Sequence, residues 1–177
     1  MGAIGRRLVK GDGVKDDMQT LASEVGTHLA QRKWMLATAE SCTGGWVAAA
    51  MTAIAGSSAW FERGFVTYSN EAKREMLGVP AALIERHGAV SEQVARAMAD
   101  GALRHSRAQI ALSITGVAGP SGGTVEKPVG LVCFGWAVGN LSQIVETKRF
   151  FGDRETVRRA SVMYALQGVL AQLKKPV

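Results

Sequence analysis

The sequence contains few of the residues that build metal centres, disulfide frameworks or membrane spans. Its 177 residues include two cysteines and three histidines, with no C-x-x-C pair and no other zinc-ligand spacing. We therefore expect no metal, and we interpret Cys42 and Cys133 as buried, reduced thiols of a cytoplasmic protein. The uncharged stretches 41–61, 108–125 and 128–145 are interrupted by Gly, Ser, Pro or Asn. Because a spanning helix needs about 20 mostly apolar residues, we expect no membrane segment.

Aromatic residues are also scarce, at 6%, although the chain is basic. It carries 21 basic and 15 acidic residues, for a net charge of +6, a balance typical of proteins with an anionic partner. Seven basic and only two acidic residues lie in 148–177. Nucleic-acid surfaces usually interleave basic residues with exposed aromatics. We therefore expect a solvated helix face there and no specific nucleic-acid partner; weak, salt-sensitive DNA binding is the alternative.

What the chain does contain is a globular balance of 47% apolar and 20% charged residues. This composition excludes a disordered chain, a disulfide scaffold and a coiled coil. The length suits one domain. Residues 1–17 show no periodicity and are interpreted as a flexible leader, so the domain is placed at 18–177.

Hydrophobic periodicity and turn residues predict the order of helices and strands. Helices are expected at 17–32, 46–54, 70–77, 81–86, 91–105 and 153–173, and strands at 34–39, 64–68, 109–115, 129–138 and 143–151. Helices between the early strands imply parallel crossovers, whereas the last two strands form an antiparallel hairpin. The predicted fold class is α/β: a single domain with one mixed β-sheet and helices on both faces. Ligands of such sheets bind where strands give way to loops and helix N-termini.

The first polar turn follows the first predicted strand and contains two adjacent nucleophiles, Ser41 and Cys42. Gly44 and Gly45 come next and open a helix. Backbone N–H groups near Thr43 and the two glycines can bind an oxyanion or a phosphate, and glycine lets a substrate approach closely. The simpler alternative is a strand-to-helix turn in which Ser41 or Thr43 caps the helix.

A serine nucleophile needs a base, and none of the three histidines lies in a loop motif beside a carboxylate. Lys73 falls at about the third position of a predicted helix. Positive potential at a helix N-terminus, with some desolvation, would lower the lysine pKa toward neutrality and make Lys73 a usable base. The alternative is an exposed lysine paired with Glu71 or Glu75. Tyr68, at the end of the second predicted strand, either relays a proton and orients the lysine or covers the sheet edge.

The third polar turn, 116–123, has four glycines and no charge. Its N–H groups can surround an anion, but no Walker A pattern follows. Arg154 begins the last predicted helix, where its guanidinium can bind a phosphate bidentately. The alternative is a solvated arginine beside Asp153.

Six short stretches follow one another along the sequence in a characteristic order: Ala39–Gly45, Gly56–Ser58, Tyr68–Lys73, Gly88–Ser91, Thr115–Pro120 and Lys127–Gly130. Together they resemble the nicotinamide-nucleotide amidase family, also known as the C-terminal domain of the competence/damage-inducible protein CinA. The resemblance covers residues from Met18 to about Leu173.

The resemblance implies hydrolysis of the carboxamide of nicotinamide mononucleotide to nicotinic acid mononucleotide and ammonia. It implies Ser41 as the nucleophile, Lys73 as the base and Tyr68 as a further catalytic residue. The remaining positions bind the oxyanion or the phosphorylated nucleotide: Thr43, Gly44, Gly45, Gly116, Gly119 and Arg154. No cofactor and no metal are implied.

Three other expectations accompany this assignment. A non-catalytic nucleotide-binding regulatory module of the same fold is the main alternative function. An amidase that uses Cys42 in place of Ser41 is a second alternative. The apolar area of a small mixed-sheet domain favours a homo-oligomer.

Overall fold

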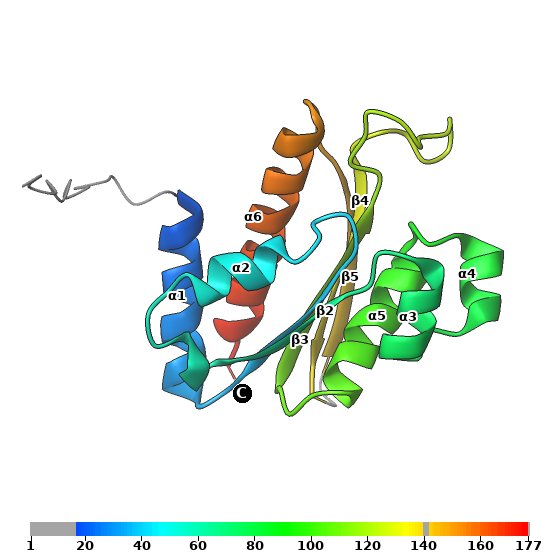
Figure 1. Ribbon diagram of the computed structural model, residues 1–177. Helices are drawn as coiled ribbons and strands as arrows, with labels where there is room; N and C mark the ends of the chain where they lie inside the picture. The colour runs from blue at the N-terminus through cyan, green and yellow to red at the C-terminus, as the bar shows by residue number, and fades with distance from the viewer. Residues whose placement is uncertain (1–16, 140–141, 177) are drawn as a thin grey trace, which may run out of the picture.

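The computed structural model describes residues 17–139 and 142–176 (Figure 1). The leader predicted for 1–17 lies outside these residues except for Asp17, which begins the first helix. Along the chain the elements are α1 (Asp17–Arg32), β1 (Leu36–Glu40), α2 (Trp46–Thr52), a 3-10 turn η1 (Ser57–Ala59), β2 (Phe61–Val66), α3 (Asn70–Leu77), α4 (Ala81–His87), α5 (Glu92–Arg104), β3 (Ile110–Gly116), β4 (Leu131–Val138), β5 (Ser142–Arg149) and α6 (Arg154–Leu173). In the described ranges, every helix is too short or too polar to cross a membrane.

One five-stranded sheet forms the centre of the molecule, in the order β2-β1-β3-β4-β5. The strands β2, β1 and β3 run parallel, and β4 and β5 follow antiparallel. The predicted mixed sheet is therefore confirmed. Because the three parallel strands end at the same edge, the turns that follow them are brought together there.

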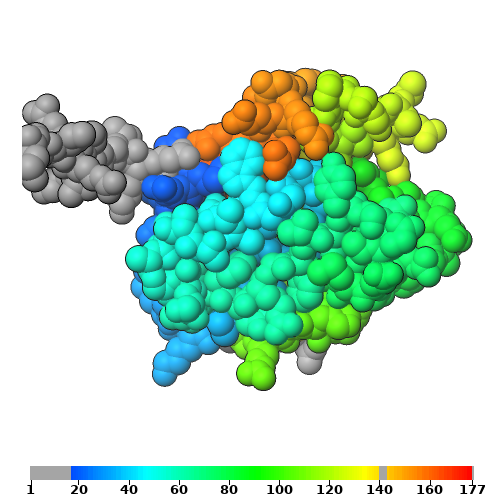
Figure 2. Space-filling model, viewed as in Figure 1, coloured from blue at the N-terminus to red at the C-terminus, as the bar shows by residue number. Residues whose placement is uncertain are grey.

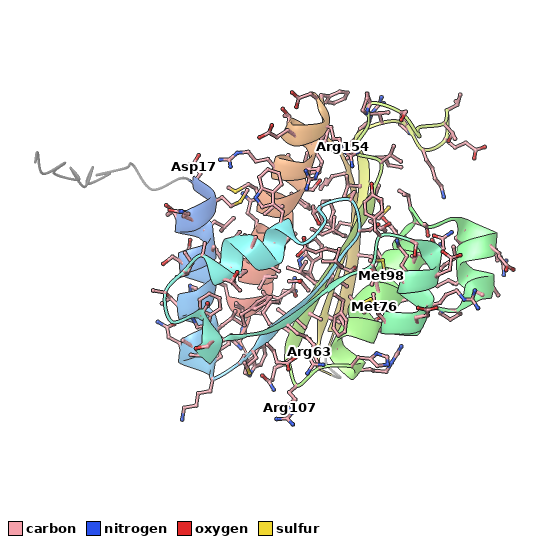
Figure 3. The ribbon with its side chains drawn as sticks, viewed as in Figure 1. Asp17, Arg63, Met76, Met98, Arg107 and Arg154 are labelled. Carbon is pink, nitrogen blue, oxygen red and sulfur yellow. The ribbon has the colours of Figure 1, made fainter. Side chains whose placement is uncertain are left out.

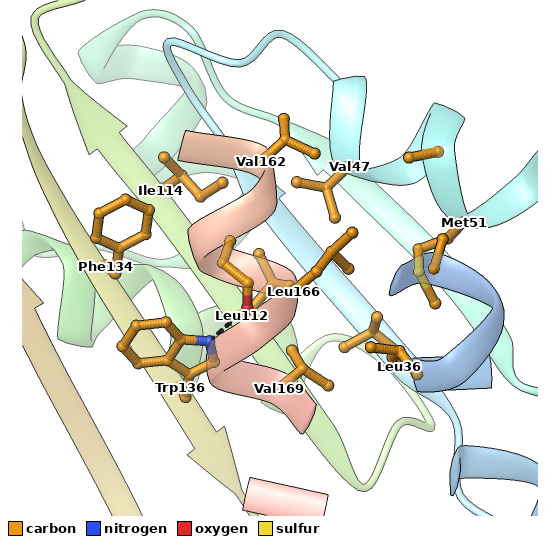
Figure 4. Packing of buried hydrophobic residues seen from close by; sticks show 14 of the residues in the cluster. Leu36, Val47, Met51, Leu112, Ile114, Phe134, Trp136, Val162, Leu166 and Val169 are labelled. Atoms are coloured by element: carbon orange, nitrogen blue, oxygen red, sulfur yellow. Dashed lines mark hydrogen bonds between the residues drawn. The ribbon is translucent and has the colours of Figure 1, made fainter. Parts of the chain in front are cut away.

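Helices cover both faces of the sheet, as the fold class requires. Figure 1 shows α1, α2 and α6 on one face and α3, α4 and α5 on the other. The first face carries the larger core, in which Leu112, Ile114 and Phe134 pack against Leu166 and its neighbours (Figure 4). The second core is smaller and is built on β1, β3, α3 and α5. Helices thus bury both faces of the central strands β1, β3 and β4, which explains the nearly continuous apolar sequence of these strands.

The second strand lies earlier in the chain than the pattern at 64–68 predicts. It spans Phe61–Val66, and the pairing with β1 ends at Glu40 opposite Val66. Thr67 still donates its N–H to the Glu40 carbonyl at 2.8 Å, but the chain then leaves the sheet. Tyr68 consequently lies in the loop after the strand. β-Branched and aromatic composition located the strand, and strand pairing determined its end.

The other bounds agree with the predicted ones or differ from them by one or two residues. The strand expected at 34–39 is Leu36–Glu40, the one expected at 129–138 begins at Leu131, and the one expected at 143–151 is Ser142–Arg149. The alanine-rich helix ends at Thr52 and not at residue 54. The last helix begins at Arg154, with Asp153 as its N-cap, as predicted.

Gly168 shows how closely α6 packs on the sheet. A Cβ at this position would lie 2.1 Å from Cζ2 of Trp136, whose indole is buried and donates to the carbonyl of Ala165 at 3.0 Å. We expect Gly168→Ala to lower the free energy of unfolding by about 1–3 kcal/mol in urea titrations, because the indole must move. Gln167→Ala, on the exposed neighbouring position, should change it by less than about 0.5 kcal/mol. Stabilisation by Gly168→Ala, as helix propensity alone predicts, would contradict this packing.

Candidate active site

A cavity of about 270 Å³ opens where β1, β2 and β3 end. Ser41, Cys42, Tyr68, Lys73 and Arg154 line it, together with residues before α5, at the end of β3 and in the loop after β3: Ala89, Val90, Thr115, Gly116, Val117, Ala118, Gly119, Ser121 and Gly122. The structure thus brings together side chains from the turn after β1, the loop after β2, α3, the loop after β3 and the start of α6.

The loop after β3 and the first turns of α6 lie next to one another on the surface. Figure 2 shows them at the top of the molecule, in yellow-green and orange, and Figure 3 places Arg154 at the start of α6. Both segments contribute to the cavity wall.

Ser41 and Lys73 are in direct contact at the bottom of this site. The Lys73 Nζ lies 3.0 Å from the Ser41 Oγ, and both residues are buried. Ser41 is fixed by its own N–H, which donates to the carbonyl of Ile114 on β3 at 3.0 Å. The nucleophile and the base proposed from the sequence are therefore within hydrogen-bond distance, although 32 positions separate them in the chain.

Two carbonyl groups orient the Lys73 amine. Its Nζ donates to the carbonyl of Thr67 at 2.8 Å and to that of Tyr68 at 3.3 Å. A neutral amine has two N–H bonds and one lone pair. When the two carbonyl groups take both hydrogens, the lone pair is left for the Ser41 hydroxyl. This arrangement suits removal of a proton from Ser41.

Burial is what changes the charge state of Lys73. Its side chain is only 1% exposed, and desolvation lowers the pKa of the ammonium below its ordinary value. The alternative of an exposed lysine paired with Glu71 or Glu75 is therefore wrong. Lys73 is also the fourth residue of α3, because the helix begins at Asn70 with the Ser69 side chain as its cap. It follows that burial, more than the helix dipole, makes this lysine a candidate base.

Glu40 is a structural residue of the turn after β1, a role that was not among those predicted from the sequence. Its buried carboxylate accepts hydrogen bonds from the Thr43 hydroxyl at 2.8 Å and from three N–H groups of the turn and the start of α2, those of Gly45, Val47 and Ala48, at 2.9–3.1 Å. Glu40 therefore acts as the cap of α2 from the end of β1. An acidic residue just before a Gly-Gly helix start is the signal that could have indicated it.

The role predicted for Gly44 and Gly45 needs correction for this reason. The Gly45 N–H donates to Glu40, and the Gly44 N–H donates to the Ser41 carbonyl at 3.0 Å. Because each of these N–H groups already has an acceptor, neither is available to a substrate. Both have positive φ angles, 62° and 94°, so the glycines serve the shape of the turn. Thr43 is buried and its side chain does not line the cavity, but its N–H, unlike those of the two glycines, donates to no oxygen atom within the described residues.

Cys42 packs into the core on the first face of the sheet and also touches the cavity. Burial raises the pKa of its thiol to about 12. Since the thiolate is the reactive form of cysteine, this residue is a poor nucleophile at neutral pH. The geometry favours Ser41 over Cys42.

Tyr68 and Arg154 meet at the mouth of the cavity. Arg154 donates to the carbonyl of Gly119 at 2.7 Å and to the Tyr68 hydroxyl at 3.3 Å. Tyr68 is 64% exposed, and its contact with Lys73 is made by its backbone carbonyl group. Gly116 and Gly119 line the wall beside them. A Cβ at either glycine would lie less than 3.0 Å from Val132 or Val129, so close packing is a second reason for glycine there.

The residues of the site do not form a metal centre. No cluster of three or more His, Cys, Asp or Glu side chains with metal-binding geometry occurs within the described residues.

The fold and the site together define a three-layer α/β protein with a buried serine–lysine pair in a small cavity at the sheet edge. Residues 18–173 match the family model of the CinA C-terminal domain, and the chain belongs to that family. The family predicted from the sequence is therefore confirmed.

Similar proteins agree with this assignment. Nicotinamide-nucleotide amidohydrolase PncC of Escherichia coli K12 is 54% identical over 88% of this chain and 94% of its own length. A CinA-like protein of Syntrophobacter fumaroxidans is 51% identical, but the match covers only 35% of its length. The crystal structure of the competence/damage inducible protein CihA from Agrobacterium tumefaciens matches with a TM-score of 0.88 and 46% identity, over 92% of this chain and 99% of that one. The predicted amidase class agrees with the names of the PncC relatives.

Proposed function

We propose that the protein hydrolyses the carboxamide of nicotinamide mononucleotide to nicotinic acid mononucleotide and ammonia. The observation that carries the proposal is the contact between Lys73 and Ser41 in a cavity at the sheet edge. The names of relatives about half identical to this chain support the same substrate and reaction.

In the proposed first step, neutral Lys73 takes the proton of Ser41 as the Oγ attacks the carboxamide carbon. The C–O bond forms and the carbonyl oxygen becomes an oxyanion. When the intermediate collapses, the C–N bond breaks, and the Lys73 ammonium gives its proton to the departing nitrogen, which leaves as ammonia. An ester between Ser41 and the nicotinoyl group results.

In the second step, Lys73 is neutral again and takes a proton from a water molecule that attacks the ester. The bond to Ser41 breaks, the serine oxygen regains its proton from Lys73, and the carboxylic acid product leaves. The mechanism uses the same two residues twice, and it requires neither a metal nor a cofactor.

Arg154 is the residue we propose for the phosphorylated end of the substrate. Both residues line the cavity, but Arg154 is exposed whereas Ser41 is buried, so a nucleotide with its amide on Ser41 extends outward toward Arg154. The guanidinium carries the positive charge that a phosphate requires. Tyr68, bound to Arg154, forms the adjacent wall.

The direct test is incubation of the purified protein with nicotinamide mononucleotide. We expect ammonia and nicotinic acid mononucleotide to appear in equal amounts, as followed by a coupled ammonia assay and by chromatography. Binding of the nucleotide without ammonia release would instead support the non-catalytic binding module. Neither binding nor release would reject both.

Cys42→Ala tests the second nucleophile. Because the Cys42 thiol is protonated at neutral pH, we expect kcat within about threefold of the wild-type value. The control is Cys133→Ala, which removes the other buried thiol far from Ser41 in sequence. Loss of turnover in Cys42→Ala alone, with Ser41 intact, would contradict the assignment of Ser41.

A further inference from the structure

Arg158 lies one turn beyond Arg154 on α6 and reaches back to the turn that carries Ser41. Its Nε donates to the carbonyl of Cys42 at 3.1 Å, and its Nη2 donates to the carbonyl of Thr43 at 2.9 Å. The guanidinium also lies over the ring of Trp46, 5.2 Å from the centroid. The side chain is thus held by three contacts, all from the turn or the start of α2.

The N–H groups around Ser41 are almost all in use. The Ser41 N–H binds Ile114, that of Gly44 binds Ser41, and that of Trp46 binds Thr43. Glu40 takes the N–H groups of Gly45, Val47 and Ala48. Those of Cys42 and Thr43 donate to no oxygen atom in the part of the chain that the structure describes, and Cys42 lines the cavity. Buried N–H groups without a partner are rare, so these two suit a ligand atom.

Peptide geometry links these two N–H groups to Arg158. The Cys42 carbonyl and the Thr43 N–H belong to one planar peptide and point in opposite directions. A guanidinium on the carbonyl oxygen draws electron density toward it and makes the N–H at the other end a stronger donor. The peptide that joins Ser41 to Cys42 is held in the same way, because its carbonyl oxygen, that of Ser41, accepts a hydrogen bond from the Gly44 N–H at 3.0 Å. Both free N–H groups are therefore fixed from their carbonyl ends.

We propose that Arg158 is a positioning residue of the reaction: it holds the turn so that the N–H groups of Cys42 and Thr43 bind the oxyanion formed on Ser41. The inference rests on the proposed function. The N–H groups of Cys42 and Thr43, and not those of Gly44 and Gly45, are then the donors to the oxyanion. Arg158 acts on them without contacting the substrate.

The test compares Arg158→Met and Arg158→Lys with wild type. Removing one oxyanion donor costs ~10²–10³-fold in kcat. Since Arg158 acts through the turn, we expect a smaller fall for Arg158→Met, about 10- to 100-fold, with KM within about threefold. Arg158→Lys keeps the charge and should fall in between. The pH midpoint of kcat/KM should stay unchanged in both, because Lys73 is not touched.

The control is Arg149→Met, which removes an exposed arginine that lies over Phe151, outside the cavity. It should behave as wild type. If kcat of Arg158→Met stays within about twofold, or if KM rises in proportion to the loss, Arg158 does not act through the turn. A shifted pH midpoint also contradicts the inference. Should Arg158→Met fail to fold, the same criteria apply to Arg158→Lys. If neither wild type nor Arg149→Met releases ammonia, the proposed function fails, and this inference with it.

Discussion

Replacing Ser41 with alanine is expected to lower kcat by at least about 10³-fold, the scale of loss when a nucleophile is removed. The substitution deletes one oxygen, whose contact is the Lys73 amine at 3.0 Å, so we expect the fold to persist. Nucleotide binding, measured by calorimetry, should stay within about fivefold of wild type, because Arg154 and the loop after β3 are unchanged. Steady-state ammonia release gives the kcat value.

A covalent intermediate makes this test sharper. Rapid acid quench of the wild-type protein during turnover should show a fraction with the mass of a nicotinoyl nucleotide ester, and peptide mapping should locate it on Ser41. Ser58→Ala, an exposed serine in η1, is the matched control and should keep full activity. Residual activity of Ser41→Ala above about a tenth of wild type, or an ester on Cys42, would refute the serine mechanism.

The fold was largely predictable, because the signals for it are local. The apolar runs that become β1, β3 and β4 and the Asp153 cap of α6 can be read from short windows of sequence. The end of β2 was not predictable from a short window of sequence, because it depends on the pairing of β2 with β1, which stops at Glu40 opposite Val66. The prediction therefore put Tyr68 at the end of the strand, whereas it lies in the loop that follows.

The site was predictable only where a residue broke a local rule. Ser41 stands in a polar turn after an apolar strand, and Lys73 is a cation in the first turns of a helix, so both could be singled out. The burial of Lys73 could not, because it depends on tertiary structure, as do the contacts of its amine with Ser41 and with the carbonyl groups of Thr67 and Tyr68. Arg158, whose importance lies in what it holds, showed no local anomaly, and Glu40 was marked only by its place just before a Gly-Gly helix start. Their partners are defined only by the tertiary structure.

Lys73→Met is expected to reduce kcat/KM by at least about 10³-fold, because it removes the base in both steps. It should at the same time preserve or raise stability at neutral pH. Desolvation lowers the pKa of Lys73 in the folded protein, so the folded state binds the proton more weakly than the unfolded state. An apolar side chain of similar length is free of that penalty. Loss of activity with undiminished stability separates a catalytic role from a structural one.

The depressed pKa of Lys73 also predicts how kcat/KM and the free energy of unfolding change with pH. In wild type, kcat/KM should rise with pH through the depressed pKa of Lys73, because only the neutral amine accepts the serine proton. The contribution of Lys73 to the free energy of unfolding, taken as the difference between wild type and Lys73→Met, should also rise with pH, from that depressed pKa up to about 10.4, the value of an exposed lysine. Both pH dependences should be absent in Lys73→Met.

Lys73→Arg is the matched control for charge, since arginine stays protonated throughout this range. It should be as inactive as Lys73→Met and less stable, because a charge that cannot be lost remains buried. Activity in Lys73→Arg would show that the amine contributes its charge and not its lone pair. A wild-type profile that stays flat down to about pH 5, far below the ordinary lysine pKa, would exclude Lys73 as the base. The two carbonyl groups of Thr67 and Tyr68 would then hold a permanent ammonium whose role is to bind the Ser41 oxygen.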